Sequence, residues 1–161
     1  MLVVADSSPL IVLVNIEQIA VLPRLFGQVI VPPEVSCELR QMNRPEAVRD
    51  FISAPPGWLL ERTPTVIESI PALHAGERAA ISLARELKDG LLLIDEARGR
   101  RAAAARKIPF TGTVGVLELA ADRGLLDLQN AFTRLKQSDF WISHELLDER
   151  LKRYQELRQR R

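Results

Sequence analysis

Short apolar runs alternate along this chain with longer segments in which apolar residues recur at every third or fourth position. The apolar runs are bounded by glycine, proline or acidic residues, a pattern typical of strands that are buried on both faces. They predict strands at residues 2–5, 28–31, 58–61, 91–95 and 108–111. The run at 91–94 is the clearest, because four apolar residues stand between a glycine and an acidic pair.

Segments with helical spacing lie between and after these strands. They predict helices at 8–15, 17–25, 33–39, 46–52, 76–87, 97–106, 113–123, 126–137 and 143–158. The segment 62–73, which contains Pro64 and Pro71, has no regular pattern. Strands that alternate with helices indicate βαβ units and an α/β fold with a mostly parallel sheet. Because helices outnumber strands, we expect a small sheet that is well covered.

Two of the predicted strands are followed directly by an aspartate. Asp6 follows the first strand, and Asp95 follows the strand at 91–94. In an open α/β sheet, ligands bind in the crevice at the carboxyl ends of the strands. Each aspartate could instead only cap the helix that follows it, which is common in such loops. Their joint occurrence predicts a shared site.

Glutamates on two helices extend this set of acids. Glu77 lies three or four residues from apolar positions of its helix and therefore leans toward the apolar face; alternatively it is an acid of the first turn that favours the helix dipole. Glu38 shares a helical face with Val35, whereas Glu34 lies one turn earlier and fits equally well by spacing. A buried carboxylate needs a cation or hydrogen-bond partners.

Composition favours one soluble domain. The chain has 161 residues, of which 47% are hydrophobic and 27% charged, and its one cysteine cannot form an internal disulfide. No apolar run approaches the ~18 residues of a membrane span, and the start lacks the basic region of a secretory signal. We therefore expect a cytoplasmic protein.

Charge is distributed unevenly along the chain. Residues 150–161 contain six basic residues and Glu156, which gives +5, so residues 1–149 carry −4 of the total of +1. A basic terminal segment is either a solvated helix face or a surface for an anionic partner.

A cluster of three or four acids indicates a particular chemistry. Like charges at one site repel each other unless a cation neutralises them. Carboxylates without histidine or cysteine favour Mg²⁺ or Mn²⁺ over zinc. Such a site can activate a water and stabilise the leaving oxygen of a phosphodiester, so we predict hydrolysis of a nucleic-acid backbone.

The chain resembles the PIN (PilT N-terminus) domain family, in particular its prokaryotic toxin-antitoxin members. The resemblance rests on five motifs in collinear order over about residues 2–126. These motifs are Asp6-Ser7-Ser8-Pro9-Leu10, Val31-Pro32-Pro33-Glu34-Val35 with Glu38-Leu39, Ala75-Gly76-Glu77-Arg78-Ala79-Ala80-Ile81, Leu93-Ile94-Asp95-Glu96 with Arg98, and Gly112-Thr113-Val114-Gly115-Val116-Leu117.

This resemblance implies a three-layer α/β/α sandwich and a Mg²⁺- or Mn²⁺-dependent endoribonuclease that acts as a toxin. Residues 1–126 would form the nuclease core and 127–161 a helical extension with a basic tail. The implied catalytic acids are Asp6, Glu38, Glu77 and Asp95. Asp6, Glu77 and Asp95 would hold the metal, with Glu38 as a further ligand or an orienting group. The third acid is an aspartate in many PIN toxins and a glutamate here.

The expected substrate-binding residues lie around these acids. Ser8 and Thr113 match hydroxyl positions of the family, and Arg98 and Arg101, with Arg100 between them, could hold RNA phosphates or form a basic exposed helix face. Trp58 and Trp141 could stack on bases, but aromatic residues make up only 5% of the chain, so we expect them to pack.

The implied partners are an RNA substrate, an antitoxin protein and a second copy of the chain, since we expect a homodimer. The final helix could pack on the body, on that copy or on the antitoxin. The alternative function is a catalytically inactive PIN-fold module that binds RNA or a protein. A different doubly wound phosphohydrolase or phospho-receiver is disfavoured, because no second aspartate stands two residues after Asp6.

Overall fold

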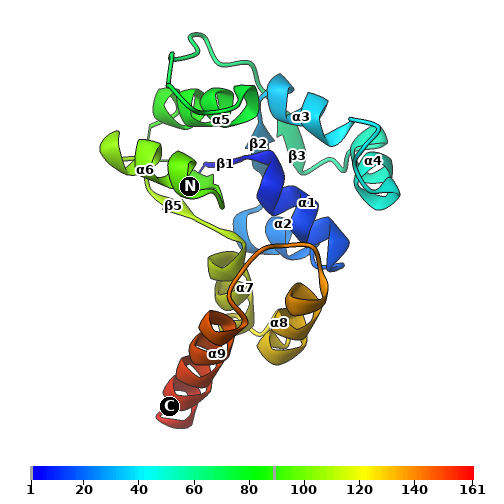
Figure 1. Cartoon of the computed structure of the whole chain (residues 1–161), viewed down its shortest axis with the longest axis vertical. Helices are drawn as coiled ribbons and strands as arrows, with labels where there is room; N and C mark the ends of the chain where they lie inside the picture. Colours follow the sequence, from blue (N-terminus) through cyan, green and yellow to red (C-terminus); the bar gives the residue numbers. More distant parts are fainter. Residues whose placement is uncertain (1, 89) are drawn as a thin grey trace.

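The computed structural model describes residues 2–88 and 90–161; Met1 and Asp89, both inside the predicted core 1–126, lie outside the described residues. The elements follow in the order β1 (Val3–Ala5), α1 (Ser7–Asn15), α2 (Val21–Phe26), β2 (Val29–Val31), α3 (Pro33–Leu39), α4 (Glu46–Ser53), β3 (Leu59–Glu61), α5 (Ala75–Glu86), β4 (Leu91–Leu93), α6 (Ala97–Ala105), β5 (Phe110–Thr111), α7 (Thr113–Asp122), α8 (Leu128–Gln137) and α9 (His144–Gln159) (Figure 1).

The strands form one five-stranded sheet in the order β3-β2-β1-β4-β5. Each pair of neighbours is parallel; in the centre Val4 is paired with Ile30 on one side and with Leu92 on the other. The prediction of a small, mostly parallel sheet is confirmed. Because β1 and β4 are neighbours, the two predicted strand-end aspartates lie at one edge of the sheet.

Alternation along the strands divides the apolar side chains between two cores. Val3 and Ala5 of β1 belong to the core that α1, α2, α3, α4 and α7 cover, whereas Val4 belongs to the core under α5 and α6. Side chains of successive strand residues point to opposite faces of a sheet, so a three-residue strand serves both cores. The result is the expected α/β/α sandwich, with helices on both faces of the sheet (Figure 1).

The last two helices pack against the first of these cores. Phe132 and Leu135 of α8 and Leu147 of α9 are buried in it. The basic residues Arg150 and Arg161 of the C-terminal segment form ion pairs with Glu118 and Asp122 of α7, respectively. Part of the basic tail therefore holds α9 against α7. The boundary at residue 126 stays a prediction.

Several boundaries differ from the sequence-based prediction, and two of these differences have a clear structural description. Helix α2 begins at Val21 instead of residue 17, because Glu17 has a φ of 59° and cannot continue a right-handed helix. Strand β4 ends at Leu93, so Ile94 and Asp95 belong to the loop that leads to α6. The segment 62–73 is irregular, as expected. Within the described residues, no helix has the length and apolar character needed to cross a membrane.

Candidate active site

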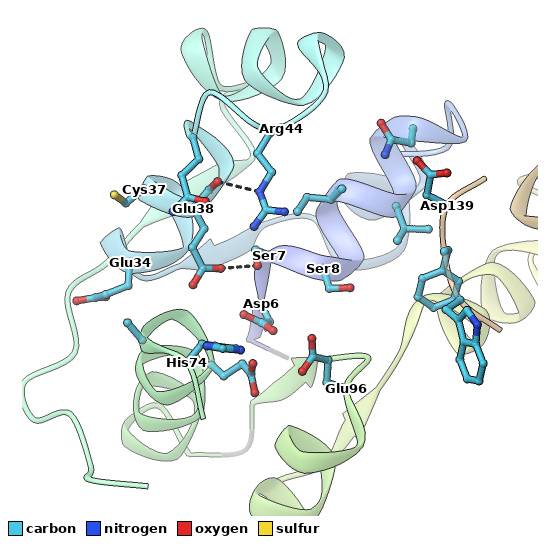
Figure 2. A pocket seen from close by; sticks show the side chains of 18 of the residues that line it. Asp6, Ser7, Ser8, Glu34, Cys37, Glu38, Arg44, His74, Glu96 and Asp139 are labelled. Atoms are coloured by element: carbon cyan, nitrogen blue, oxygen red, sulfur yellow. Dashed lines mark hydrogen bonds between the residues drawn. The ribbon is translucent and has the colours of Figure 1, made fainter. Parts of the chain in front are cut away.

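A cavity of about 800 Å³ lies where β1 ends and α1, α3 and α5 meet. Six acidic residues line it, and they come from segments far apart in the sequence: Asp6, Glu34, Glu38, Glu77, Glu96 and Asp139. Figure 2 shows Glu38 and Glu96 on either side of Asp6, with Asp139 beyond Ser8 on the segment that leads to α9.

Asp6 lies at the floor of this cavity. Its backbone N–H donates to the carbonyl of Leu93 (2.9 Å), which extends the β1–β4 pairing by one residue. The residue is only 3% exposed, and among the described residues its Oδ1 atom has no hydrogen-bond partner. Burial raises the pKa of Asp6 from 3.8 to about 7, and the negative charges of Glu38, Glu77 and Glu96 contribute to this rise. Among the described residues, Asp6 forms no ion pair with a basic side chain.

Glu77 lies beside it in the first turn of α5. This residue is 5% exposed, and its Oε2 atom also lacks a partner among the described residues. Burial raises the pKa of Glu77, and the charge of Glu96 raises it further. The sequence-based expectation that Glu77 points inward, toward the apolar face of its helix, agrees with this burial.

Glu38 is held in place by two hydrogen bonds. Its carboxylate accepts one from the Ser7 hydroxyl (2.6 Å) and one from the backbone N–H of Gly76 (3.1 Å), at the N-terminus of α5. A Cβ atom at Gly76 would lie 2.3 Å from Glu38 Oε1, so only glycine lets the carboxylate approach this closely. The carboxylate of Glu34, the alternative residue, points away from Asp6 (Figure 2).

Asp95 has a different environment from the other acids. It accepts hydrogen bonds from the N–H and the hydroxyl of Thr113 (2.7 and 2.8 Å) and from the hydroxyl of Ser8 (3.3 Å). Its carboxylate therefore stabilises the N-terminus of α7, and Asp95 does not line the cavity. The structure thus joins Ser8, Asp95 and Thr113, three of the predicted site residues, into one hydrogen-bonded group next to Asp6.

The neighbouring residue, Glu96, lines the cavity instead. The predicted site residues include Asp95 and not Glu96, although the charge of Glu96 raises the pKa of both Asp6 and Glu77. The sequence contains the signal, an acidic pair at the strand exit, but not the direction in which each side chain points.

The basic residues that line the cavity are also not those expected. Arg44 and His74 line the cavity, and Arg44 Nε donates to the backbone carbonyl of Glu38 (3.2 Å). Arg98 and Arg101 instead line a separate cavity of about 390 Å³ beside residues 70–73. Their predicted role in substrate binding stays a prediction.

The donor set fits a hard divalent cation. As their side chains stand, no three aspartate, glutamate, histidine or cysteine residues in 2–88 and 90–161 converge to hold a metal ion. However, Asp6 and Glu77 each have a buried carboxylate oxygen without a partner among these residues, and their charges repel. Mg²⁺ and Mn²⁺ favour oxygen ligands of this kind. A cation at this point would neutralise the charges and provide the missing partner.

Comparison with known proteins identifies one family. The family model DUF3368, described as a PIN domain, matches residues 2–156 and therefore includes α8 and most of α9. No curated protein and no solved structure was found to match this chain.

Proposed function

The chain belongs to the PIN domain family, whose members are generally nucleases, and from this premise we propose that it is a Mg²⁺- or Mn²⁺-dependent endoribonuclease. The observation that supports this most is a set of buried carboxylate oxygens in one cavity that have no hydrogen-bond partner among the described residues: Asp6 Oδ1 and Glu77 Oε2, together with Glu34 Oε2. Keeping such carboxylates in a fold costs free energy, and a cation held by Asp6 and Glu77 would offset this cost.

In this proposal Asp6 and Glu77 hold the cation, with Asp95 as the third ligand. Bound Mg²⁺ or Mn²⁺ supplies a Lewis acid for phosphate oxygens and lowers the pKa of a water molecule. Glu38 positions Ser7 and the N-terminus of α5 around the cavity through its two hydrogen bonds. Arg44 offers a guanidinium for a phosphate group of the substrate.

RNA cleavage by Asp95→Asn tests whether Asp95 binds the cation or only stabilises the N-terminus of α7. Asparagine has the size of aspartate and keeps one acceptor oxygen for the Thr113 N–H, so a residue that only stabilises α7 would tolerate the change. We expect the purified wild-type protein to cleave RNA with Mg²⁺ or Mn²⁺ and Asp95→Asn to lose cleavage while keeping its thermal stability. Glu149→Gln, on the exposed face of α9, is the matched control. Equal cleavage by the variant and the wild type would remove Asp95 from the ligand set.

Gly76→Ala tests the position of Glu38. The added Cβ would displace the Glu38 carboxylate from Gly76 and Ser7. Because alanine stabilises a helix by about 0.5–1 kcal/mol relative to glycine, we expect unfolding to change little and cleavage to fall about 10- to 100-fold, as for loss of a supporting partner. Urea unfolding and cleavage rates measure both. Gly57→Ala, with open space around the site of the added Cβ, is the control; full activity of Gly76→Ala would refute this role for Glu38.

An inactive binding module is the second candidate. It is favoured by the Asp95 carboxylate, which is already bonded to Thr113 and Ser8, and by the lack of three converging ligands among the described residues. Calorimetric titration with Mn²⁺ separates the two functions, since a nuclease takes up the ion and a binding module need not.

We further propose that the nuclease is the toxin of a toxin-antitoxin pair and forms a homodimer in the cytoplasm. These assignments follow the resemblance to prokaryotic PIN toxins. Growth arrest on expression in a bacterial host, relieved by Asp95→Asn, would support the toxin role. Measurement of the mass in solution tests the homodimer.

A further inference from the structure

We infer that Trp141 is a stacking platform for an unpaired base of the RNA substrate, next to the phosphate that the acids act on; this inference rests on the proposed function. Sequence composition predicted that both tryptophans pack. Trp58 does so, half-buried and with its ring centroid 6.0 Å from that of Phe51. For Trp141 the prediction is wrong, because its side chain is 97% exposed.

Trp141 belongs to the same cavity as the acids. The segment Ser138, Asp139, Phe140 and Trp141 forms one wall of the cavity, and Asp6, Glu77 and Glu96 lie in another part of it. The volume of about 800 Å³ is within the range of about 300–1,000 Å³ that binding sites for small molecules occupy. A nucleotide with its phosphate at the acids therefore has its base or a neighbouring base within the same cavity as the indole.

The segment around Trp141 is fixed on both sides. Phe140 and Ile142 pack against the core that α1, α2, α3, α4 and α7 cover, so the tryptophan between them is directed outward. The Ser138 hydroxyl accepts a hydrogen bond from Phe140 N–H (3.2 Å) and donates to the Leu135 carbonyl (2.7 Å). On the other side, Ser143 caps α9, and Leu147 anchors this helix in the core. The indole is thus presented on a supported segment.

Exposure of this side chain beside the cavity that the six acids line has a specific use. Tryptophan is highly buried on average in proteins, and an aromatic ring without a packing partner offers both faces to a ligand. Every base has a π-face, so stacking on an aromatic side chain tolerates different sequences. Inside a duplex, neighbouring base pairs cover both faces of each base, so a base offers a face to such a ring where it is unpaired or at an end. The substrate class is therefore single-stranded RNA, or the loops and ends of folded RNA.

Fluorescence of Trp141 tests the stacking directly. The protein contains two tryptophans, so Trp58→Phe leaves Trp141 as the sole indole, and Asp6→Asn added to it blocks cleavage. We expect an unstructured oligoribonucleotide to quench the fluorescence in a saturable way and a long RNA duplex, in which neighbouring base pairs cover the faces of all internal bases, to quench it much less at the same nucleotide concentration. Anisotropy of a labelled oligoribonucleotide measures binding independently. An unchanged fluorescence at saturating RNA, or no binding of RNA, would overturn the inference.

Binding and kinetics of Trp141→Ala supply the second readout. Stacking is worth about 1–3 kcal/mol per base, so we expect affinity for single-stranded RNA to fall about 10-fold and Trp141→Phe to restore most of it. In the enzyme with Asp6 intact, KM should rise more than kcat falls. Val66→Ala, another exposed apolar residue, is the control. If the wild type cleaves RNA and Trp141→Ala has the same KM as the wild type, stacking is refuted and the proposed nuclease activity is supported. If RNA binding depends on Trp141 but the wild type does not cleave RNA, the proposed nuclease activity is refuted and stacking is supported.

Discussion

Asp6→Asn is expected to lower RNA cleavage by on the order of 10³-fold, the effect of losing one preorganised electrostatic group at a reacting centre. Asparagine has the shape of aspartate but carries no charge, so the cavity keeps its form and loses its most buried anion. In the wild type, Asp6 Oδ1 has no hydrogen-bond partner among the described residues. The asparagine side chain that replaces Asp6 carries no negative charge to balance the charge of a divalent cation. Initial rates of cleavage of a fluorogenic oligoribonucleotide, measured over a range of Mn²⁺ concentrations, test this expectation.

A control variant and a stability measurement test whether unfolding causes the loss of RNA cleavage in Asp6→Asn. Asp127→Asn changes an aspartate that caps α8 by accepting from the Asn130 N–H (2.8 Å), away from the cavity, and should leave cleavage unchanged. Asp6→Asn should at the same time be more stable than the metal-free wild type at pH 8, because it removes an unfavourable buried charge. A variant that is more stable yet inactive is typical of a functional site. Cleavage within about twofold of the wild type would exclude Asp6 from the reaction.

The sequence could predict which strands carry the acids, but not the direction of every side chain. The apolar runs before Asp6 and Asp95 predict strand ends, and the helical spacing around Glu77 predicts an inward position; these are local patterns. Asp95 bonds to Thr113, whereas Glu96 lines the cavity. The acidic pair in the sequence does not indicate which of its two side chains takes which direction.

Other features of the site depend on contacts between distant segments. Helical spacing does not distinguish Glu38 from Glu34, and only the family resemblance selected Glu38. The contact that favours Glu38 in the structure is with Gly76, which is 38 positions away and leaves room for the Glu38 carboxylate. Trp141 lines the cavity because α8 and α9 pack on the same core as α1 and α7, which places the segment between α8 and α9 beside the cavity. A residue at the surface next to a cavity has the same sequence pattern as any other exposed residue. Tertiary packing therefore determines the substrate side of the site more than local sequence does.

The stability of the metal-free protein is expected to fall as the pH rises from 5 to 8. The pKa of Asp6 is about 7 in the folded protein and has its ordinary value of 3.8 in the unfolded chain. Between these values the folded protein binds more protons than the unfolded chain, so the free energy of unfolding decreases with increasing pH. The loss from Asp6 is on the order of 4 kcal/mol over the whole window and about 2–3 kcal/mol between pH 5 and pH 8. Glu77, whose pKa is also raised, acts in the same direction.

Urea unfolding of the metal-free protein at pH 5, 6, 7 and 8 measures this dependence. The pKa values of Glu68 and Glu86 are lowered, so these residues affect stability with the opposite sign, but they act below about pH 4.5, outside this range. Asp6→Asn should flatten the profile, and Asp127→Asn should leave it as in the wild type. A wild-type profile that is flat, or that rises with pH, would contradict a buried, uncompensated Asp6.

Divalent cations should reverse this loss of stability, because an ion that binds only the folded state stabilises it by mass action. With Mn²⁺ at 100 times its dissociation constant, we expect the free energy of unfolding at pH 8 to rise by about 2.7 kcal/mol. At pH 5 the rise should be much smaller, since the ion then competes with the proton on Asp6. The same experiment on Asp6→Asn should show little effect of Mn²⁺ at either pH. Stabilisation that is equal at pH 5 and pH 8 would place the ion away from Asp6. Stabilisation by Mn²⁺ at pH 8 and not at pH 5 would support binding of the ion to ionised Asp6, the group whose negative charge destabilises the metal-free fold.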